Sequence, residues 1–491
     1  MNVPHTTLLK PTHEWLRQLS VAFIPNKRTP LLDRLSESLL EYFQEHGHIL
    51  QGEPDNETDV ILTTGVFGDP IRWRDALLFT ARRRFELDYS PTVFTLLHIT
   101  PEQFKETLTQ FDRALQKKPL NPQDFAFPGL GPDAYQTLSE QGLRGGPILS
   151  LVRLVQTQTM SIRVIMVVGH DVPLEAYTFD LVGAYPRTPA GDEHFFYTDL
   201  MFRIQTAAST REVTNHQVVG KPIPSDVWDK LETPGAMFKA GRELGKRNFF
   251  TEMVRVANLA HVPALQNAIS SQYSEGCYAT WNPQISALVA TITGSARPVV
   301  KDNLTDDELA VLVGVRPDGE GALVRHVEGI RNDPPSSEAV ELFEMDNPLP
   351  WIRLRDEWAL HAKVPVARSK LHGHRSVRTY DPNYVEHVFL SEPYYHYPVS
   401  CSTEAQAIAI KNAFSSSATL QNPDDPRQVV FTILPGHGIV VVEKWALGKE
   451  PFQLIWEYMD DGKLEIEKII PQGRLAFEED QQGMMILKSL D

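Results

Sequence analysis

The apolar residues of this chain come in short runs, and this limits what the chain can fold into. The longest runs, such as Val164–Val168 and Ile439–Val442, have four or five residues, whereas a helix that crosses a membrane needs about 20. Short runs rich in branched side chains are typical of buried β-strands. The sequence therefore predicts sheets, and no membrane partner is expected.

Composition narrows the class further. At 491 residues the chain suggests about three domains, and 42% apolar with 22% charged residues is typical of a globular protein. The net charge of −16 disfavours a nucleic-acid partner. Only Cys277 and Cys401 occur, so a disulfide framework is excluded and a cytoplasmic location is expected. Residues Met1 to Trp15 lack the apolar core of a signal peptide.

Strand and helix signals alternate in the first part of the chain. Asp59–Gly65 and Thr92–His98 are typical of buried strands, and helical patterns follow them from Ile71 and Pro101. This alternation predicts an α/β fold with a doubly wound, Rossmann-like parallel sheet. We assign it to residues 1–144.

A second α/β block is predicted for residues 145–345. Ser161–Val168 has the composition of a strand, whereas Asp226–Ile269 and Ala287–Gly294 have helical patterns. We expect this block to form a second Rossmann-like domain with a doubly wound parallel sheet.

The sequence pattern changes after residue 345, and residues 346–491 are predicted to form a mainly β C-terminal domain. Val429–Leu434, Ile439–Val442 and Phe452–Trp456 are β-prone pieces separated by turn residues. A single helix is predicted near Glu404–Phe414.

Histidines gather in the second half of the chain. Seven of the sixteen occur in one stretch of about 110 residues: His326, His361, His372, His374, His387, His396 and His437. Histidine is the commonest metal ligand and a common general base near neutral pH. A histidine-rich zinc site with an open water position is typical of metal-dependent hydrolases, so a hydrolase or lyase built on this cluster is one hypothesis.

Two carboxylates offer a different metal site. Glu275 and Asp302 both occur at predicted element ends, where side chains can face the ligand cleft of an open α/β sheet. With His326 they make an oxygen and nitrogen set suited to Mn²⁺ or Mg²⁺. The alternative is structural: Glu275 as a helix N-terminal charge, Asp302 as a loop residue and His326 as a core histidine.

A family resemblance bears on this choice. The ordered segments are Val262–Gln266, Tyr273–Gly276, an apolar helix ending in Thr293–Gly294, Asp302, and His326–Glu328. This order resembles the central region of the L-fucose/L-arabinose isomerase family, over about 70 residues. The family architecture is two Rossmann-like domains followed by a β-rich domain, which is similar to the organisation predicted above.

The resemblance implies a ligand set. It would make Glu275, Asp302 and His326 ligands of a divalent cation, Mn²⁺ above all. The last histidine ligand stays open between the segment of His372 and His374 and the segment of His437, which we take as the leading candidate.

The resemblance also implies a reaction and a state of assembly. The reaction is aldose–ketose isomerisation through an ene-diol, with Glu275 and Asp302 as the acid/base pair. A cationic side chain, Arg297 or Lys370, would hold the developing enediolate charge. The candidate residues for contact with the sugar are Arg297, Lys370, His372, His374 and Tyr395. A homo-oligomer is expected. The alternative to turnover is a sugar-binding or structural protein of the same fold.

Overall fold

The structure is a computed structural model. It describes residues 17–55, 57–67, 84–85, 91–106, 109, 162–171, 174–178, 188, 191–209, 215–250, 276–293, 299–354, 362–391, 402–435, 437–467 and 475–489. No helix among these residues is long and apolar enough to span a bilayer.

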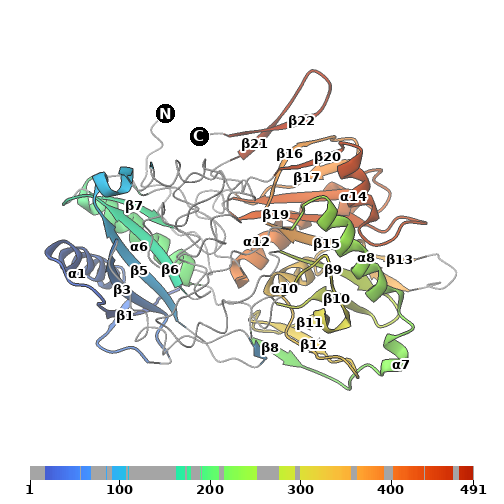
Figure 1. Cartoon of the computed structure of the whole chain (residues 1–491), viewed down its shortest axis with the longest axis horizontal. Helices are drawn as coiled ribbons and strands as arrows, with labels where there is room; N and C mark the ends of the chain where they lie inside the picture. Colours follow the sequence, from blue (N-terminus) through green and yellow to red (C-terminus); the bar gives the residue numbers. More distant parts are fainter. Residues whose placement is uncertain are drawn as a thin grey trace.

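The first sheet has six strands in the order β2-β1-β3-β5-β6-β7. All neighbours are parallel except β6 and β7, which pair antiparallel. Helices α1 and α6 share one apolar core with this sheet. Figure 1 shows this unit at one end of the molecule. The elements are β1 (Ser20–Ile24), α1 (Pro30–Glu45), β2 (Ile49–Gln51), β3 (Val60–Val66), β5 (Thr92–Ile99), β6 (Ile162–Val168), β7 (Glu175–Thr178) and α6 (Glu193–Ala208).

Local chemistry explains the start of this unit. The Thr29 hydroxyl accepts a hydrogen bond from the Leu32 amide at 3.1 Å, and Pro30 opens α1, as expected of a capped helix. The strands predicted from Asp59, Thr92 and Ser161 are confirmed as β3, β5 and β6. The sheet continues past residue 144, where a boundary was expected, because β6 pairs with β5.

The second sheet has ten strands in the order β17-β18-β19-β15-β9-β10-β11-β12-β8-β4. Most pairs are antiparallel; the pairs of β8 with β12 and β4, and of β17 with β18, are parallel. The strands are β4 (Arg84–Phe85), β8 (Asn215–Val218), β9 (Cys277–Asn282), β10 (Ala287–Thr291), β11 (Leu309–Val315), β12 (Ala322–Arg325), β15 (Ala367–Gly373), β17 (Val385–His387), β18 (Val429–Leu434) and β19 (Gly438–Lys444).

Two sequence expectations are wrong in this region. The helix predicted over Ala287–Gly294 is strand β10, and β9, β10, β11 and β12 pair antiparallel rather than in a parallel sheet. Only four residues connect β9 to β10, and such a short connection allows only antiparallel pairing. The apolar run misled because periodicity alone does not separate a short buried strand from a helix.

The remaining elements complete a strand-rich C-terminal region, as predicted. Phe452–Trp456 is the exception, because Gln453–Asp460 forms a helix instead of a strand. The other strands are β13 (Trp351–Arg353), β14 (Lys363–Pro365), β16 (Ser376–Tyr380), β20 (Leu464–Glu467), β21 (Leu475–Glu479) and β22 (Met485–Ser489). The other helices are α7 (Ser225–Trp228), α8 (Glu232–Lys246), the 3₁₀ helix η3 (Asp306–Glu308), α10 (Ser337–Glu344), α12 (Glu404–Ser415), α13 (Ala418–Gln421) and α14 (Gln453–Asp460).

Helices cover both faces of the ten-stranded sheet. Val441 of β19 packs in a core with α8 and α14, whereas its neighbours Val440 and Val442 pack in a second core with α12. This alternation follows from the two-residue period of a strand. Figure 1 shows α12 beside β15 and β19, and this is the face on which the candidate site is built.

Candidate functional site

Three histidines meet where β15 ends beside the start of β19. His372 is near the end of β15, His374 follows that strand, and His437 is in the turn between β18 and β19. The strands approach closely there, because a Cβ on Gly438 would lie 2.2 Å from the Gly373 carbonyl oxygen. Glycine therefore permits the contact that brings His437 to the other two.

The histidine trio, His372, His374 and His437, is compact and buried. The three side chains are 0%, 4% and 4% exposed, and one ring nitrogen from each lies within 4.8 Å of the others. Ring centroids are 4.6 Å apart for His372 and His437 and 5.0 Å for His374 and His437. Histidine, cysteine and carboxylate side chains can all bind metals. Among the described residues, these three histidines form the group of such side chains that lies at metal-ligand spacing.

A buried chain of hydrogen bonds positions His372 and His437, two members of the trio. His372 Nδ1 lies 2.9 Å from the Ile439 carbonyl oxygen, and its Nε2 lies 3.1 Å from His437 Nε2. His437 Nδ1 lies 2.6 Å from Gln406 Nε2 of α12. Gln406 Oε1 accepts from the Ser402 amide at 2.9 Å, and the Ser402 hydroxyl donates to Glu338 Oε1 of α10 at 2.8 Å.

The donor set fits a borderline divalent cation. Imidazole nitrogens suit zinc and its neighbours in the first transition row, and three histidines with a fourth open position form a known catalytic zinc arrangement. The bond from His372 Nδ1 to a backbone carbonyl is the outer contact that metal-binding histidines usually make. His372, His374 and His437 would be the residues that hold such an ion.

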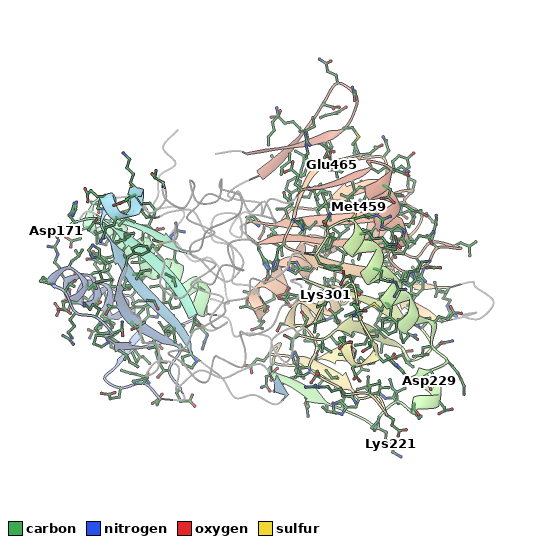
Figure 2. All side chains as sticks on the ribbon, viewed as in Figure 1. Asp171, Lys221, Asp229, Lys301, Met459 and Glu465 are labelled. Carbon is green, nitrogen blue, oxygen red and sulfur yellow. The ribbon has the colours of Figure 1, made fainter. Side chains whose placement is uncertain are left out.

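The structure does not bring Asp302 to the trio. Asp302 is exposed on a turn. A Cβ added to Gly245 of α8 would lie 2.8 Å from the Cβ of Asp302. Its neighbour Lys301 is buried. Figure 2 shows Lys301 in the part of the molecule that holds the ten-stranded sheet. Asp302 is therefore packed against α8, on the opposite face of the sheet from α12.

His326 is also remote from the trio. It follows β12, which is four strands from β15 in the sheet order. At about 4.8 Å per strand this places it roughly 19 Å away. One ion cannot be shared by His326 and His437 over that separation.

Lys370 forms a buried ion pair instead of facing an open pocket. Its ammonium donates to Asp346 Oδ2, and the side chain is 0% exposed. Burial lowers the pKa of Lys370 and raises the pKa of Asp346 to about 6, against the attraction of the pair. Lys370 is thus a structural neighbour of His372, two residues along β15, with no open path to a ligand.

Glu275, Arg297 and Tyr395 lie outside the described residues. The chain does reach the trio directly after Glu275. Gly276 has φ +82°, and a Cβ there would lie 2.4 Å from the His372 carbonyl oxygen. The backbone that follows Glu275 therefore packs on His372.

Sequence reasoning missed Gln406, Ser402 and Glu338. A signal exists for Gln406, since it is a polar residue on the buried face of α12, next to Ala405 and four residues before Ile410. Ser402 and Glu338 are ordinary polar residues in the sequence, and only the packing of α10 against α12 brings them together.

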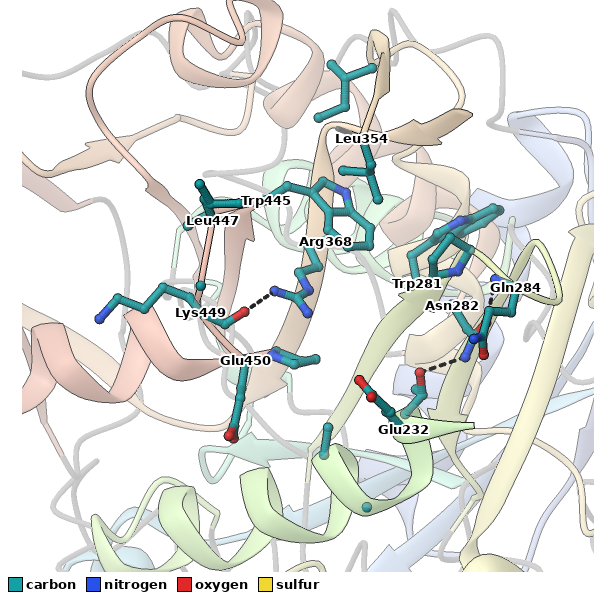
Figure 3. A pocket seen from close by; sticks show the side chains of 18 of the residues that line it. Glu232, Trp281, Asn282, Gln284, Leu354, Arg368, Trp445, Leu447, Lys449 and Glu450 are labelled. Atoms are coloured by element: carbon teal, nitrogen blue, oxygen red, sulfur yellow. Dashed lines mark hydrogen bonds between the residues drawn. The ribbon is translucent and has the colours of Figure 1, made fainter. Parts of the chain in front are cut away.

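A separate groove of about 1210 Å³ lies on the α8 side of the sheet. Figure 3 shows its walls, which include Trp281 and Trp445. The Arg368 guanidinium lies 4.7 Å from the Trp445 ring centre and donates to the Lys449 carbonyl oxygen at 2.6 Å. Indole rings suit ring-shaped ligands, but the histidine trio does not line this groove.

Comparison with known proteins gives no match. No family model matches the chain. No curated protein matches it, and no solved structure matches it.

Proposed function

We propose that this protein is an enzyme that depends on a divalent cation, and that the cation is held by His372, His374 and His437. The observation that supports this most is the convergence of three buried histidine nitrogens within 4.8 Å. Histidine is the commonest metal ligand in proteins, so three imidazoles gathered in one core favour a bound cation.

We further propose that the reaction is the interconversion of an aldose and a ketose through an ene-diol, with a small sugar as substrate. When bound, the cation would polarise the sugar carbonyl and bring its neighbouring hydroxyl oxygen close. The protein must then move one proton between the two carbons. Glu275 is the proposed base, because Gly276, the residue after it, packs on His372. Asp302 has no part in this version of the site.

The nitrogen-rich donor set changes the expected metal. Mn²⁺ was expected with two carboxylates, whereas three imidazoles favour Zn²⁺, Co²⁺ or Ni²⁺. Mn²⁺ remains in the proposal if Glu275 supplies an oxygen ligand.

A metal-dependent hydrolase is the second candidate. The all-histidine set favours it, because three protein ligands and one water position form a hydrolytic zinc site. In this reading the resemblance to the isomerases would concern fold only.

The two candidates differ in what they do to a sugar. Metal-stripped protein would be given Zn²⁺, Co²⁺, Mn²⁺ or Mg²⁺ and incubated with aldopentoses and 6-deoxyhexoses in D₂O. An isomerase forms the ketose and places solvent deuterium on the carbon that receives the proton, and His372→Ala should abolish this. Hydrolysis of model esters or amides with no sugar turnover would contradict the isomerase and support the hydrolase.

We also propose a homo-oligomer in the cytoplasm. For the fold, we propose that the first unit is a Rossmann-like, doubly wound domain. Its support is the strand order β2-β1-β3-β5-β6, which is the order of a doubly wound α/β sheet.

A further inference from the structure

The hydrogen-bond chain at the trio fixes where protons are, beginning at Ser402. The Ser402 backbone amide can only donate, and Gln406 Oε1 accepts from it at 2.9 Å. Ser402 is fully buried and has φ +62°, so its amide cannot donate a hydrogen bond to solvent instead. The oxygen of Gln406 is therefore committed, and its NH₂ group faces His437.

The orientation of Gln406 determines the tautomer of His437. An NH₂ group donates, so His437 Nδ1, 2.6 Å away, must accept and carries no proton. In a neutral ring the proton is then on Nε2, which lies 3.1 Å from His372 Nε2. His372 can accept there, because its own proton on Nδ1 is donated to the Ile439 carbonyl. Each bond in the chain then has one donor and one acceptor.

This arrangement is suited to metal binding at His372 but not at His437. A neutral histidine ligates through an unprotonated nitrogen, and His372 offers Nε2. His437 Nε2 carries the proton, and its Nδ1 is covered by Gln406. Whichever nitrogen His437 uses, the Gln406 amide must move.

We infer that Gln406 is a positioning residue that controls whether His437 can act as a ligand, so that a three-histidine centre forms only when the Gln406 amide turns over. This inference rests on the proposed metal centre. Turning the amide presents Oε1 to His437 Nδ1–H and breaks the bond to the Ser402 amide. Metal binding is thereby coupled to the segment that leads into α12. In the resting state His437 is a hydrogen-bond donor.

The tautomer is tested on metal-free wild-type protein. Nitrogen-15 NMR of histidine-labelled protein, with His437→Gln for assignment, should show His437 protonated at Nε2 and His372 at Nδ1. A His437 ring protonated at Nδ1 would overturn the inference without touching the metal proposal. This measurement needs no folded variant of Gln406.

Metal affinity tests the control by Gln406. Gln406→Glu keeps an acceptor for the Ser402 amide and offers a carboxylate to His437 Nδ1–H, which completes a carboxylate–histidine–metal set. Zinc should bind at least about tenfold more tightly, within the range that outer contacts of metal ligands usually produce, and His437 should show the Nδ1–H tautomer. Asn412→Asp adds the same charge on the exposed side of α12 and should leave zinc affinity within about twofold.

The outcomes separate the two proposals. Zinc binding by wild type with equal affinity in Gln406→Glu would overturn the control by Gln406 and leave the metal centre standing. Equal tightening by Asn412→Asp would also overturn it, because charge alone would explain the gain. Absence of zinc from both wild type and Gln406→Glu would overturn the metal centre and the inference together.

Discussion

At the scale of single residues, the most informative feature is Glu443, a carboxyl side chain buried in the ten-stranded sheet. Glu443 of β19 is 1% exposed and accepts hydrogen bonds from the Ser369 hydroxyl at 2.7 Å and from the Phe452 amide at the start of α14. Burial raises the pKa of Glu443 to about 7, although these hydrogen bonds and Arg368 lower it. Its proton is therefore bound more tightly in the folded chain than in the unfolded one.

Glu443 should make stability depend on pH in a stated direction. A raised folded pKa contributes stability below the unfolded value of 4.5, and this contribution is lost as pH rises from 4.5 through about 7. The loss amounts to roughly 3 kcal/mol at most. Glu443→Gln cannot ionise, so the free energy of unfolding, measured with urea at pH 5 and pH 8, should change less with pH than in wild type.

The exposed Glu450, paired with Lys239 at 2.6 Å, offers the control. Glu450→Gln makes the same chemical change at the surface and should alter stability by less than about 0.5 kcal/mol at either pH. Equal pH dependence in wild type and Glu443→Gln would contradict the buried-carboxyl account.

Residue-scale prediction of the site from the sequence succeeded only in part. His372, His374 and His437 could be singled out because the residue type is rare and chemically suited to metals, and the structure brings them together. Asp302 and His326 were chosen by order along the chain, and strand pairing then placed them elsewhere. Order in sequence does not fix which strand ends meet.

At the scale of elements, α8 lies directly on β9 and the turn after residue 300. Gly241 makes this possible: a Cβ there would lie 2.0 Å from the Lys301 carbonyl oxygen and 2.5 Å from the Tyr278 hydroxyl. A Cβ at Gly235 of the same helix would meet nothing within 4 Å. Alanine at Gly241 therefore tests the close packing of α8, whereas alanine at Gly235 tests helix propensity alone.

Alanine at these two positions should have opposite effects. Gly241→Ala should destabilise the protein by about 1–3 kcal/mol, because α8 must move outward. Gly235→Ala should stabilise it by up to about 1 kcal/mol through helix propensity. Urea unfolding followed by circular dichroism gives both values. Destabilisation of equal size in both variants would show that the close contact at Gly241 is not decisive.

Elements were predictable where local chemistry decides them. Branched runs such as Val60–Val66 formed strands, and the helix near Glu404 was confirmed as α12. The strand predicted over Phe452–Trp456 was wrong, because Phe452 adopts φ +69° and its amide donates a hydrogen bond to the Glu443 carboxylate. That contact starts a helix, and it comes from Glu443 of β19, nine residues upstream.

At the scale of the whole molecule, pairing between strands far apart in the sequence determines the ten-stranded sheet, and this pairing could not be predicted from the sequence. β15 pairs with β9 and β19, so segments about 90 and 70 residues apart are neighbours. The mixed α/β class was predictable from short runs and alternation, whereas a ten-stranded, mainly antiparallel sheet was not. The metal proposal depends on this pairing, because the trio exists only where these strands meet.

The most direct test of the central claim is the metal content of the purified chain. Protein prepared without chelator would be analysed for zinc, cobalt, nickel and manganese as wild type, His372→Ala and His326→Ala, with melting temperature checked alongside. If the histidine trio holds the ion, we expect about one ion per chain in wild type and His326→Ala, and almost none in His372→Ala. No ion in wild type even after incubation with each metal, or loss in His326→Ala with retention in His372→Ala, would contradict it.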